Sequence, residues 1–181
     1  SAIERFGFQF ELNKIKSLSE ANFKSNIVNL LITSELTKKP NFGEISAESG
    51  KASFKAIVEA IKLAKLEKVS GIVTAPINKK SLNLASVNFP GHTEILSKYS
   101  GSGKVAMMLL NKDIKTVLVT LHCSLAEAMQ RISVQKEFEV IELAYKGAKM
   151  LGIKDPIIAV AALNPHAGEE GLFGNEEKEI I

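Results

Sequence analysis

The clearest pattern along the chain is a set of short apolar runs without polar alternation, separated by segments with helical periodicity. A run of this kind suits a strand that is covered on both faces, as in a parallel sheet. The runs lie at residues 69–75, 105–110, 116–121 and 157–162, with further strand candidates at residues 8–12 and 27–33. The pattern therefore predicts an α/β fold built on a mostly parallel sheet.

Helical spacing predicts most of the segments between these runs. A helix is expected from Ser46 onwards, where Ser46 or Ser49 can cap the first turn, with lysines collecting near its end. Pro76 suits the first turn of a short helix, where its missing N–H group would have no helical partner. Two more short helices are expected at residues 91–100 and 125–131.

A longer helix is expected from Ser133, as its cap, to Leu151, with Gly152 just beyond its end. Its inward-facing residues are expected to be Phe138, Ile141, Tyr145 and Ala148.

Two of the predicted strands are too close in sequence to be parallel neighbours. Only a tight turn separates residues 105–110 from residues 116–121. A parallel crossover needs a dozen or more residues, so this pair must be antiparallel. The predicted sheet is therefore mixed.

The chain has three histidines, and each belongs to a strand-end or loop segment. His122 and His166 both follow apolar runs, and the carboxyl ends of strands in one parallel sheet lie side by side. The two imidazoles are therefore expected to meet around a metal ion. Two imidazoles suit zinc, iron, cobalt or nickel but do not complete a coordination sphere. The residues alone leave a purely structural role for each histidine open.

Other segments carry candidate chemistry with an ordinary alternative. Lys79 and Lys80 beside a helix start could bind a phosphate, or could be solvated lysines at a strand-to-helix turn. Glu169 and Glu170 could act as acids or simply lie in an exposed loop. The glycines at 168, 171 and 174 lack the spacing and helix context of a dinucleotide-binding fingerprint.

Composition narrows the class of protein. With 181 residues, 45% of them hydrophobic, the chain can fill the core of one α/β domain. A formal charge of +3 with interspersed acids argues for a small anionic ligand rather than nucleic acid. The single Cys123 excludes an internal disulfide and suggests a cytoplasmic protein. No apolar run approaches the ~20 residues that span a bilayer, so no membrane partner is expected.

Four motifs resemble one enzyme family. They are residues 74–79 (TAPINK), 89–94 (FPGHTE), the strand end at His122, and 163–169 (LNPHAGE) with 173–177 (FGNEE). In this order they closely resemble the 4-hydroxythreonine-4-phosphate dehydrogenase family of vitamin B6 (pyridoxine) biosynthesis. The likeness extends from about the helix after Ser46 to the end of the chain.

The resemblance implies an isocitrate-dehydrogenase-like α/β/α fold and a cytoplasmic homodimer that uses NAD or NADP and a divalent metal such as zinc, magnesium or cobalt. It implies oxidation and decarboxylation of 4-phosphooxy-L-threonine, a phosphorylated amino hydroxy acid, to 3-amino-2-oxopropyl phosphate. Carried over by motif, His122 and His166 are metal ligands, and His92, Thr93 and Lys79 bind the substrate. It implies no catalytic side chain beyond the metal site.

The resemblance also implies that residues 1–181 form a single central α/β region of a larger two-domain enzyme, with residues 1–46 only weakly assigned. The family's third metal histidine, supplied by the partner subunit, and most of its dinucleotide site have no counterpart in the sequence. Paralogues that act on phosphorylated threonate or erythronate fit the same motifs. A non-catalytic remnant that keeps the metal-binding fold is an alternative of another class.

Overall fold

The computed structural model describes residues 5–37 and 40–181. The chain divides into two compact units, Ser1–Gly101 and Ser102–Ile181. Among the described residues, no helix is both long enough and apolar enough to cross a membrane.

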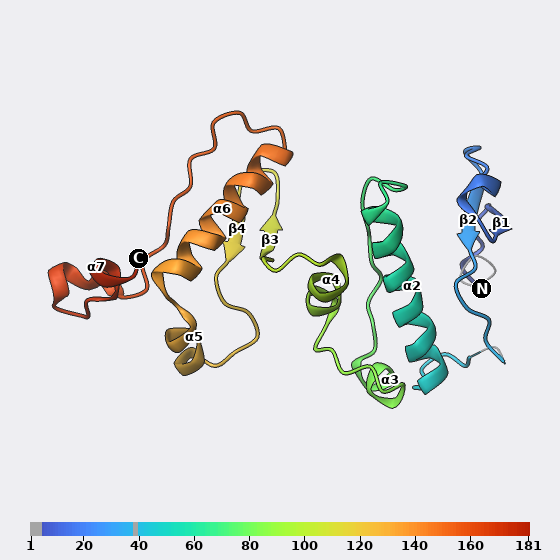
Figure 1. Cartoon of the computed structure of the whole chain (residues 1–181), viewed down its shortest axis with the longest axis horizontal. Coiled ribbons are helices and arrows are strands. Elements are labelled where there is room, and N and C mark those ends of the chain that lie inside the picture. The colour runs from blue at the N-terminus through green and yellow to red at the C-terminus, as the bar shows by residue number, and fades with distance from the viewer. Residues whose placement is uncertain (1–4, 38–39) are drawn as a thin grey trace. The chain divides into compact units, whose positions relative to one another are not determined.

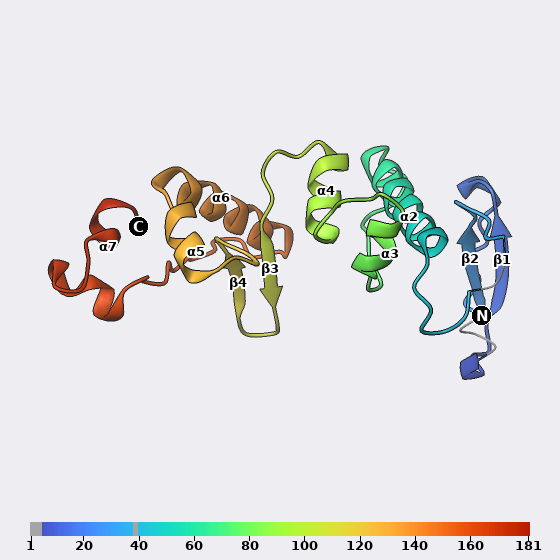
Figure 2. The same ribbon diagram turned by 90° about the horizontal axis from the view of Figure 1, so that it is seen from below.

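The first unit begins with a pair of parallel strands. β1 (Glu11–Ile15) pairs with β2 (Ile27–Leu31) in a register that sets Glu11 beside Ile27 (Figure 2). A short 3₁₀ helix, η1 (Leu18–Glu20), lies in the connection between them. β2 was expected at residues 27–33 and is confirmed. β1 starts later than the predicted 8–12.

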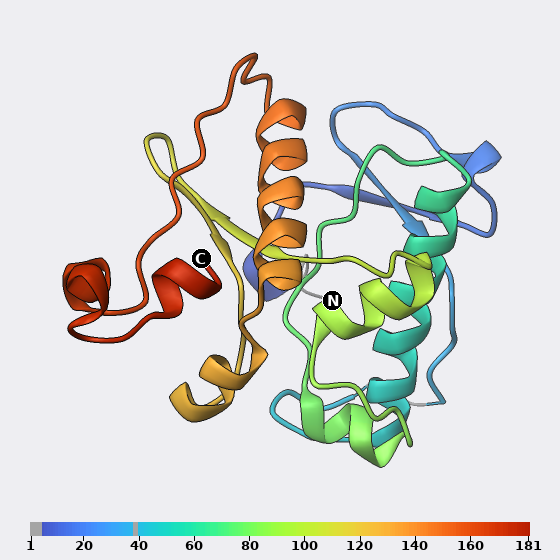
Figure 3. The same ribbon diagram turned by 60° about the vertical axis from the view of Figure 1, so that its left-hand side comes forward.

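The core of the first unit is formed by three of its helices. α2 (Ala47–Lys65) is capped by Ser46, whose hydroxyl accepts a hydrogen bond from the Ser49 N–H at 3.2 Å. α3 (Lys79–Leu84) and α4 (His92–Ser100) pack against α2, as Figure 3 shows. The buried residues that they share are Ile57, Ile61, Leu82 and Ile95. Fully burying such a side chain stabilises the fold by roughly 1.5–3 kcal/mol.

α2 and α3 approach so closely at Gly50 that only a glycine fits. A Cβ atom at this position would lie 2.0 Å from the carbonyl oxygen of Ser81 and 2.9 Å from the backbone nitrogen of Leu82. Both contacts are to backbone atoms, which no side-chain rotation can relieve. Gly50 therefore sets the distance between the two helices.

The second unit contains the expected antiparallel pair. β3 (Met107–Leu110) and β4 (Lys115–Leu118) form a hairpin beside α6 (Val134–Met150), visible in Figure 1. The Asn111 side-chain oxygen closes its turn by accepting hydrogen bonds from the Asp113 and Ile114 N–H groups at 2.9 and 2.8 Å. The antiparallel prediction is confirmed.

The helix boundaries of the second unit also agree with the sequence. α5 (Leu125–Arg131) starts in a capping box in which Ser124 and Glu127 each accept a hydrogen bond from the other's backbone N–H. Ser133 caps α6, and Gly152 follows its end at φ 85°, a conformation that glycine adopts without strain. Two short elements end the unit, the 3₁₀ segment η2 (Pro165–Gly171) and α7 (Glu176–Glu179).

Two of the predicted strands are not strands in this structure. Residues 69–75 and 157–162 have no ladder partner in the described part of the chain. Val73 and Ile157 are 101% and 97% exposed. An apolar run indicates that a segment prefers to be buried. A strand also needs a neighbouring strand whose backbone it can hydrogen-bond, and these segments have no such neighbour here.

Two local predictions were wrong. Pro76 is not in the first turn of α3, because Asn78 caps that helix by accepting a hydrogen bond from the Ser81 N–H at 2.9 Å. On α6, Phe138 and Tyr145 are 58% and 47% exposed, whereas Val140 is buried. The face of α6 that packs is therefore rotated from the predicted stripe.

Candidate functional site

The candidate substrate residues of the first unit stand at two helix starts. Lys79 is the first residue of α3 and is exposed, so its ammonium group is open to an anionic ligand. His92 and Thr93 begin α4 and are partly buried. Gly91, before them, gives this helix no side-chain cap.

His92 carries the buried polar atom of greatest interest in this unit. Its Nε2 atom is buried and has no hydrogen-bond partner among the residues that the structure describes. A buried ring nitrogen without a partner loses its hydration and gains nothing in return. A polar group of a ligand that reached His92 would remove this cost.

His122 follows β4 in the second unit, at the entry to α5. It is exposed and has a φ of 48°, in the left-handed region that non-glycine residues rarely occupy. Strain of this kind concentrates at functional sites, where the surrounding structure holds the residue in place. Cys123, next in sequence, is a partly buried free thiol.

His166 lies in a longer left-handed segment. The five residues His166, Ala167, Gly168, Glu169 and Glu170 have φ values of 53°, 53°, 75°, 41° and 55°. Four of the five are not glycine, so the segment is strained along most of its length. His166 is exposed, and its ring centroid is 6.2 Å from that of Phe173.

The segment before His166 is bound to α7 through a carboxylate. Oε1 of Glu177 accepts hydrogen bonds from the N–H groups of Leu163 and Asn164 at 3.0 and 2.6 Å. The side-chain amide of Asn164 donates to Oε2 of Glu177 at 3.1 Å and to Oε2 of Glu176 at 2.7 Å. We call Asn164, Glu176 and Glu177 the carboxylate clamp.

Two glycines make room for this clamp. A Cβ atom on Gly168 would lie 2.8 Å from the Gly174 carbonyl oxygen and 2.9 Å from Oε2 of Glu177. A Cβ atom on Gly174 would lie 2.3 Å from Oε2 of Glu176. These two glycines are therefore explained by close packing within the loop.

The clamp lowers the pKa of Glu177. The hydrogen bond from the Asn164 backbone is the largest cause, and partial loss of hydration opposes it. A carboxylate with a depressed pKa stabilises the fold at pH values above its ordinary pKa of 4.5, and that stability is lost as the pH falls through the lower folded value.

We therefore expect the loop at residues 163–174 to open in acid before α6 unfolds. Amide hydrogen exchange at Leu163 and Asn164 should be slow above the ordinary pKa of 4.5 and should accelerate, relative to the intrinsic rate, as the pH falls through the lower folded pKa. In Glu177→Gln this acid-induced change should disappear. An identical pH response in both proteins would contradict the role of Glu177.

The metal ligands expected from the sequence both belong to the second unit. Within the described ranges 5–37 and 40–181, no group of three or more His, Cys, Asp or Glu side chains could hold a metal ion. Imidazole nitrogens are donors that zinc and cobalt accept. The donor type thus fits a divalent ion, whereas these residues do not form a complete coordination sphere. The approach of His122 to His166 stays a prediction.

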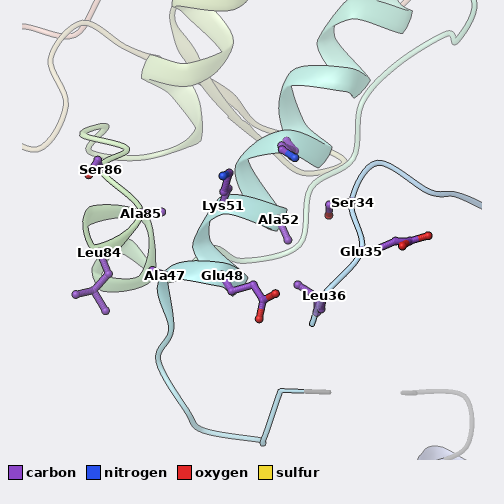
Figure 4. Close-up of a pocket in the computed structure, with 11 residues that line it drawn as sticks. Ser34, Glu35, Leu36, Ala47, Glu48, Lys51, Ala52, Leu84, Ala85 and Ser86 are labelled. Atoms are coloured by element: carbon purple, nitrogen blue, oxygen red, sulfur yellow. The ribbon is translucent and has the colours of Figure 1, made fainter. Parts of the chain in front are cut away.

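The first unit contains a cavity of about 520 Å³. Figure 4 shows it between the segment at Ser34, the start of α2 and the end of α3. Its lining residues are Ser34, Glu35, Leu36, Ala47, Glu48, Lys51, Ala52, Lys55, Leu84, Ala85 and Ser86. None of the candidate site residues lines it.

The histidine motifs and the clamp lie within a segment that matches a known protein family. A family model described as "Pyridoxal phosphate biosynthetic protein PdxA" matches residues 1–181. The chain belongs to the PdxA family.

Curated PdxA-like relatives carry two different names. The chain is 49% identical over 180 residues to a 4-hydroxythreonine-4-phosphate dehydrogenase of Beijerinckia indica, a match that covers 99% of this chain and 53% of the relative. It is 36% identical over 173 residues to a D-threonate 4-phosphate dehydrogenase of Cupriavidus necator, covering 96% and 52%. The chain thus spans about half the length of the curated relatives it matches.

Solved structures agree with this PdxA assignment. A crystal structure of a 4-hydroxythreonine-4-phosphate dehydrogenase from Burkholderia phymatum matches with a TM-score of 0.87 and 34% identity, covering 99% of this chain and 55% of that one. The chain therefore has the mixed α/β fold of this family, as expected from the sequence. The predicted membership of the 4-hydroxythreonine-4-phosphate dehydrogenase family is confirmed.

The carboxylate clamp was missed by the sequence analysis. In the sequence, Glu176 and Glu177 belong only to the motif at residues 173–177, and in the structure they begin α7. One signal could have indicated the clamp. The Asn164-Pro165 pair opens a glycine-rich loop, and Glu176 and Glu177 follow the end of that loop.

Proposed function

We propose that the chain carries part of the active site of a PdxA-type dehydrogenase. The proposed reaction is the NAD- or NADP-linked oxidation of 4-phosphooxy-L-threonine, followed by loss of carbon dioxide to give 3-amino-2-oxopropyl phosphate. The observation that carries the proposal is the 49% identity over 180 residues to a relative named 4-hydroxythreonine-4-phosphate dehydrogenase. The motifs around His92, His122 and His166 lie within that match.

Each candidate residue has a role that its surroundings support. His122 and His166, both exposed and both at positive φ, would bind the divalent ion (zinc, magnesium or cobalt). When bound, such an ion supplies Lewis-acid stabilisation of negative charge on a substrate oxygen. In the first unit, the unpartnered His92 Nε2 and the Thr93 hydroxyl would hydrogen-bond the substrate, and Lys79 would attract its phosphate.

The enzyme is proposed to act as a cytoplasmic homodimer with the site shared across the interface. The support for this is the family resemblance of the histidine motifs. A chain that supplies two imidazoles leaves coordination positions for ligands from another chain or for water.

A second candidate substrate is D-threonate 4-phosphate, because the relative from Cupriavidus necator carries that name. The two substrates differ next to the carboxylate, where one has an amino group and the other a hydroxyl group. A non-catalytic remnant is the alternative of another class.

One graft distinguishes these functions. The chain would replace the matching segment of the Beijerinckia indica relative, and NADH or NADPH formation would be measured with each substrate. We expect turnover with 4-phosphooxy-L-threonine. The graft with Thr93→Val should raise KM by roughly 10- to 100-fold, because a hydrogen bond to a charged group contributes about 1.5–3 kcal/mol.

Ala60→Ser, on α2 and outside the motifs, serves as the control for this graft. A preference of more than tenfold for D-threonate 4-phosphate would favour the second substrate. A folded graft that binds zinc but turns over neither substrate would favour the remnant. An unchanged KM in Thr93→Val would remove Thr93 from the substrate site.

A further inference from the structure

The carboxylate clamp is a polar arrangement that the proposed reaction does not itself use. It joins α7 to the two residues that precede Pro165, across 13 positions of sequence between Asn164 and Glu177. Its bonds end two residues before His166. The clamp therefore adjoins the turn that carries His166.

Glu177 supplies most of the bonds that hold this segment. The N–H groups of Leu163 and Asn164 lie at the end of an extended stretch that has no ladder partner in the described part of the chain. Both donate to one carboxylate oxygen, at 3.0 and 2.6 Å. Hydrogen bonds to an ionised acceptor are shorter and stronger than hydrogen bonds between neutral groups. Glu177 therefore fixes this backbone by accepting hydrogen bonds from N–H groups that a neighbouring strand would bond in a sheet.

The fixed backbone leads directly into the left-handed segment. The carbonyl oxygen of Asn164 accepts the Ala167 N–H at 3.2 Å, and the carbonyl oxygen of Gly168 accepts the Phe173 N–H at 3.0 Å. Sparsely populated backbone conformations persist only where the surroundings determine them. The turn that carries His166 is thus tied on one side to Asn164, which Glu177 holds by two hydrogen bonds, and Glu177 accepts a third from the preceding residue, Leu163.

We infer that Glu177 is a positioning residue for His166, which holds the backbone before the Pro-His turn so that the imidazole keeps one direction. The part of this inference that concerns a metal ion rests on the proposed function. Partners that orient a metal ligand typically change metal affinity by 10- to 100-fold when they are removed.

Glu176 provides a matched comparison within the clamp. Its side chain accepts a hydrogen bond from the Asn164 side-chain amide at 2.7 Å, and this donor is not a backbone N–H group. Glu179 lies on the same helix and is exposed. If orientation depends on the backbone bonds, Glu177 should matter most, Glu176 less and Glu179 not at all.

The test uses the 181-residue chain and its variants Glu177→Gln, Glu177→Ala, Glu176→Gln and Glu179→Gln. The first measurement is the nuclear Overhauser effect between the His166 and Phe173 rings, whose centroids are 6.2 Å apart, together with amide exchange at Leu163 and Asn164. The second is zinc affinity by calorimetry. Far-UV circular dichroism identifies any variant that has lost its fold. If Glu177→Ala does not fold, Glu177→Gln still tests the inference, because glutamine has nearly the volume of the native side chain.

We expect both Glu177 variants to lose the contact between the rings, to speed amide exchange and to bind zinc 10- to 100-fold more weakly. Glu179→Gln should match the unchanged chain. Retention of the ring contact and of amide protection in both Glu177 variants would overturn the inference. If the contact depends on Glu177 but the unchanged chain does not bind zinc, the positioning role stands and the proposed metal site fails.

Discussion

Replacing His166 with alanine is expected to weaken zinc binding by the chain at least roughly 100-fold, more than loss of an orienting partner does. The proposed site has two protein ligands in this chain, so removing one leaves a single imidazole and water. A single exposed imidazole binds zinc weakly. Calorimetric titration of zinc into the chain and into His166→Ala measures the difference. His122→Ala should show the same loss.

His92→Ala is the control for this comparison, because His92 lies in the first unit and is assigned to the substrate. Its zinc affinity should stay within about twofold of the unchanged chain. The double variant without His122 and His166 should bind little more weakly than either single variant, since the ligands act as a unit. Equal affinity in His166→Ala and the unchanged chain would exclude His166 as a ligand.

Replacing Gly50 with alanine is expected to destabilise the first unit by about 3 kcal/mol or more, at the upper end of overpacking effects. The new methyl group would lie 2.0 Å from the Ser81 carbonyl oxygen and 2.4 Å from its carbonyl carbon. Alanine also favours a helix over glycine by about 1 kcal/mol. The overlap outweighs this gain, because both contacts are to backbone and α2 must move away from α3. Urea unfolding gives the change in free energy.

Gly147→Ala is the matched control, since Gly147 also lies inside a helix, α6. The methyl group there would lie 2.7 Å from Cε of Met108, the end of a flexible side chain that can rotate away. Its stability should change by less than about 1 kcal/mol in either direction. Equal stability of Gly50→Ala and Gly147→Ala would show that α2 and α3 do not pack as described.

Features determined by neighbouring residues could be predicted from the sequence. The caps at Ser46 and Ser133 and the glycine after α6 are confirmed, because a cap depends on side chains within three or four residues. The antiparallel pairing of β3 and β4 is confirmed for a similar reason, since a tight turn permits no other arrangement.

Features determined by distant residues could not be predicted from the sequence. The apolar run at residues 157–162 indicates that the segment prefers to be covered, but a strand requires a partner elsewhere in the chain, which periodicity does not supply. The stripe through Phe138 and Tyr145 failed because the face of α6 that packs depends on where the hairpin lies, with Met108 beside Gly147.

The candidate site shows the same division. The histidine motifs are local and led to the PdxA family, which the whole-chain match confirms. The left-handed conformation of His122 and His166 was not predictable, because positive φ is uncommon in non-glycine residues and the sequence does not show which histidines adopt it. The clamp was missed because Glu177 and Asn164 are brought together only by the folded loop.

The central claim is that His122 and His166 bind one divalent ion. A crystal structure of the chain grown with zinc, with the metal located by anomalous scattering, tests it most directly. We predict one zinc ion with a ring nitrogen of each histidine at about 2.0–2.1 Å. Ring nitrogens more than roughly 8 Å apart, or a zinc ion bound by neither histidine, would contradict the claim.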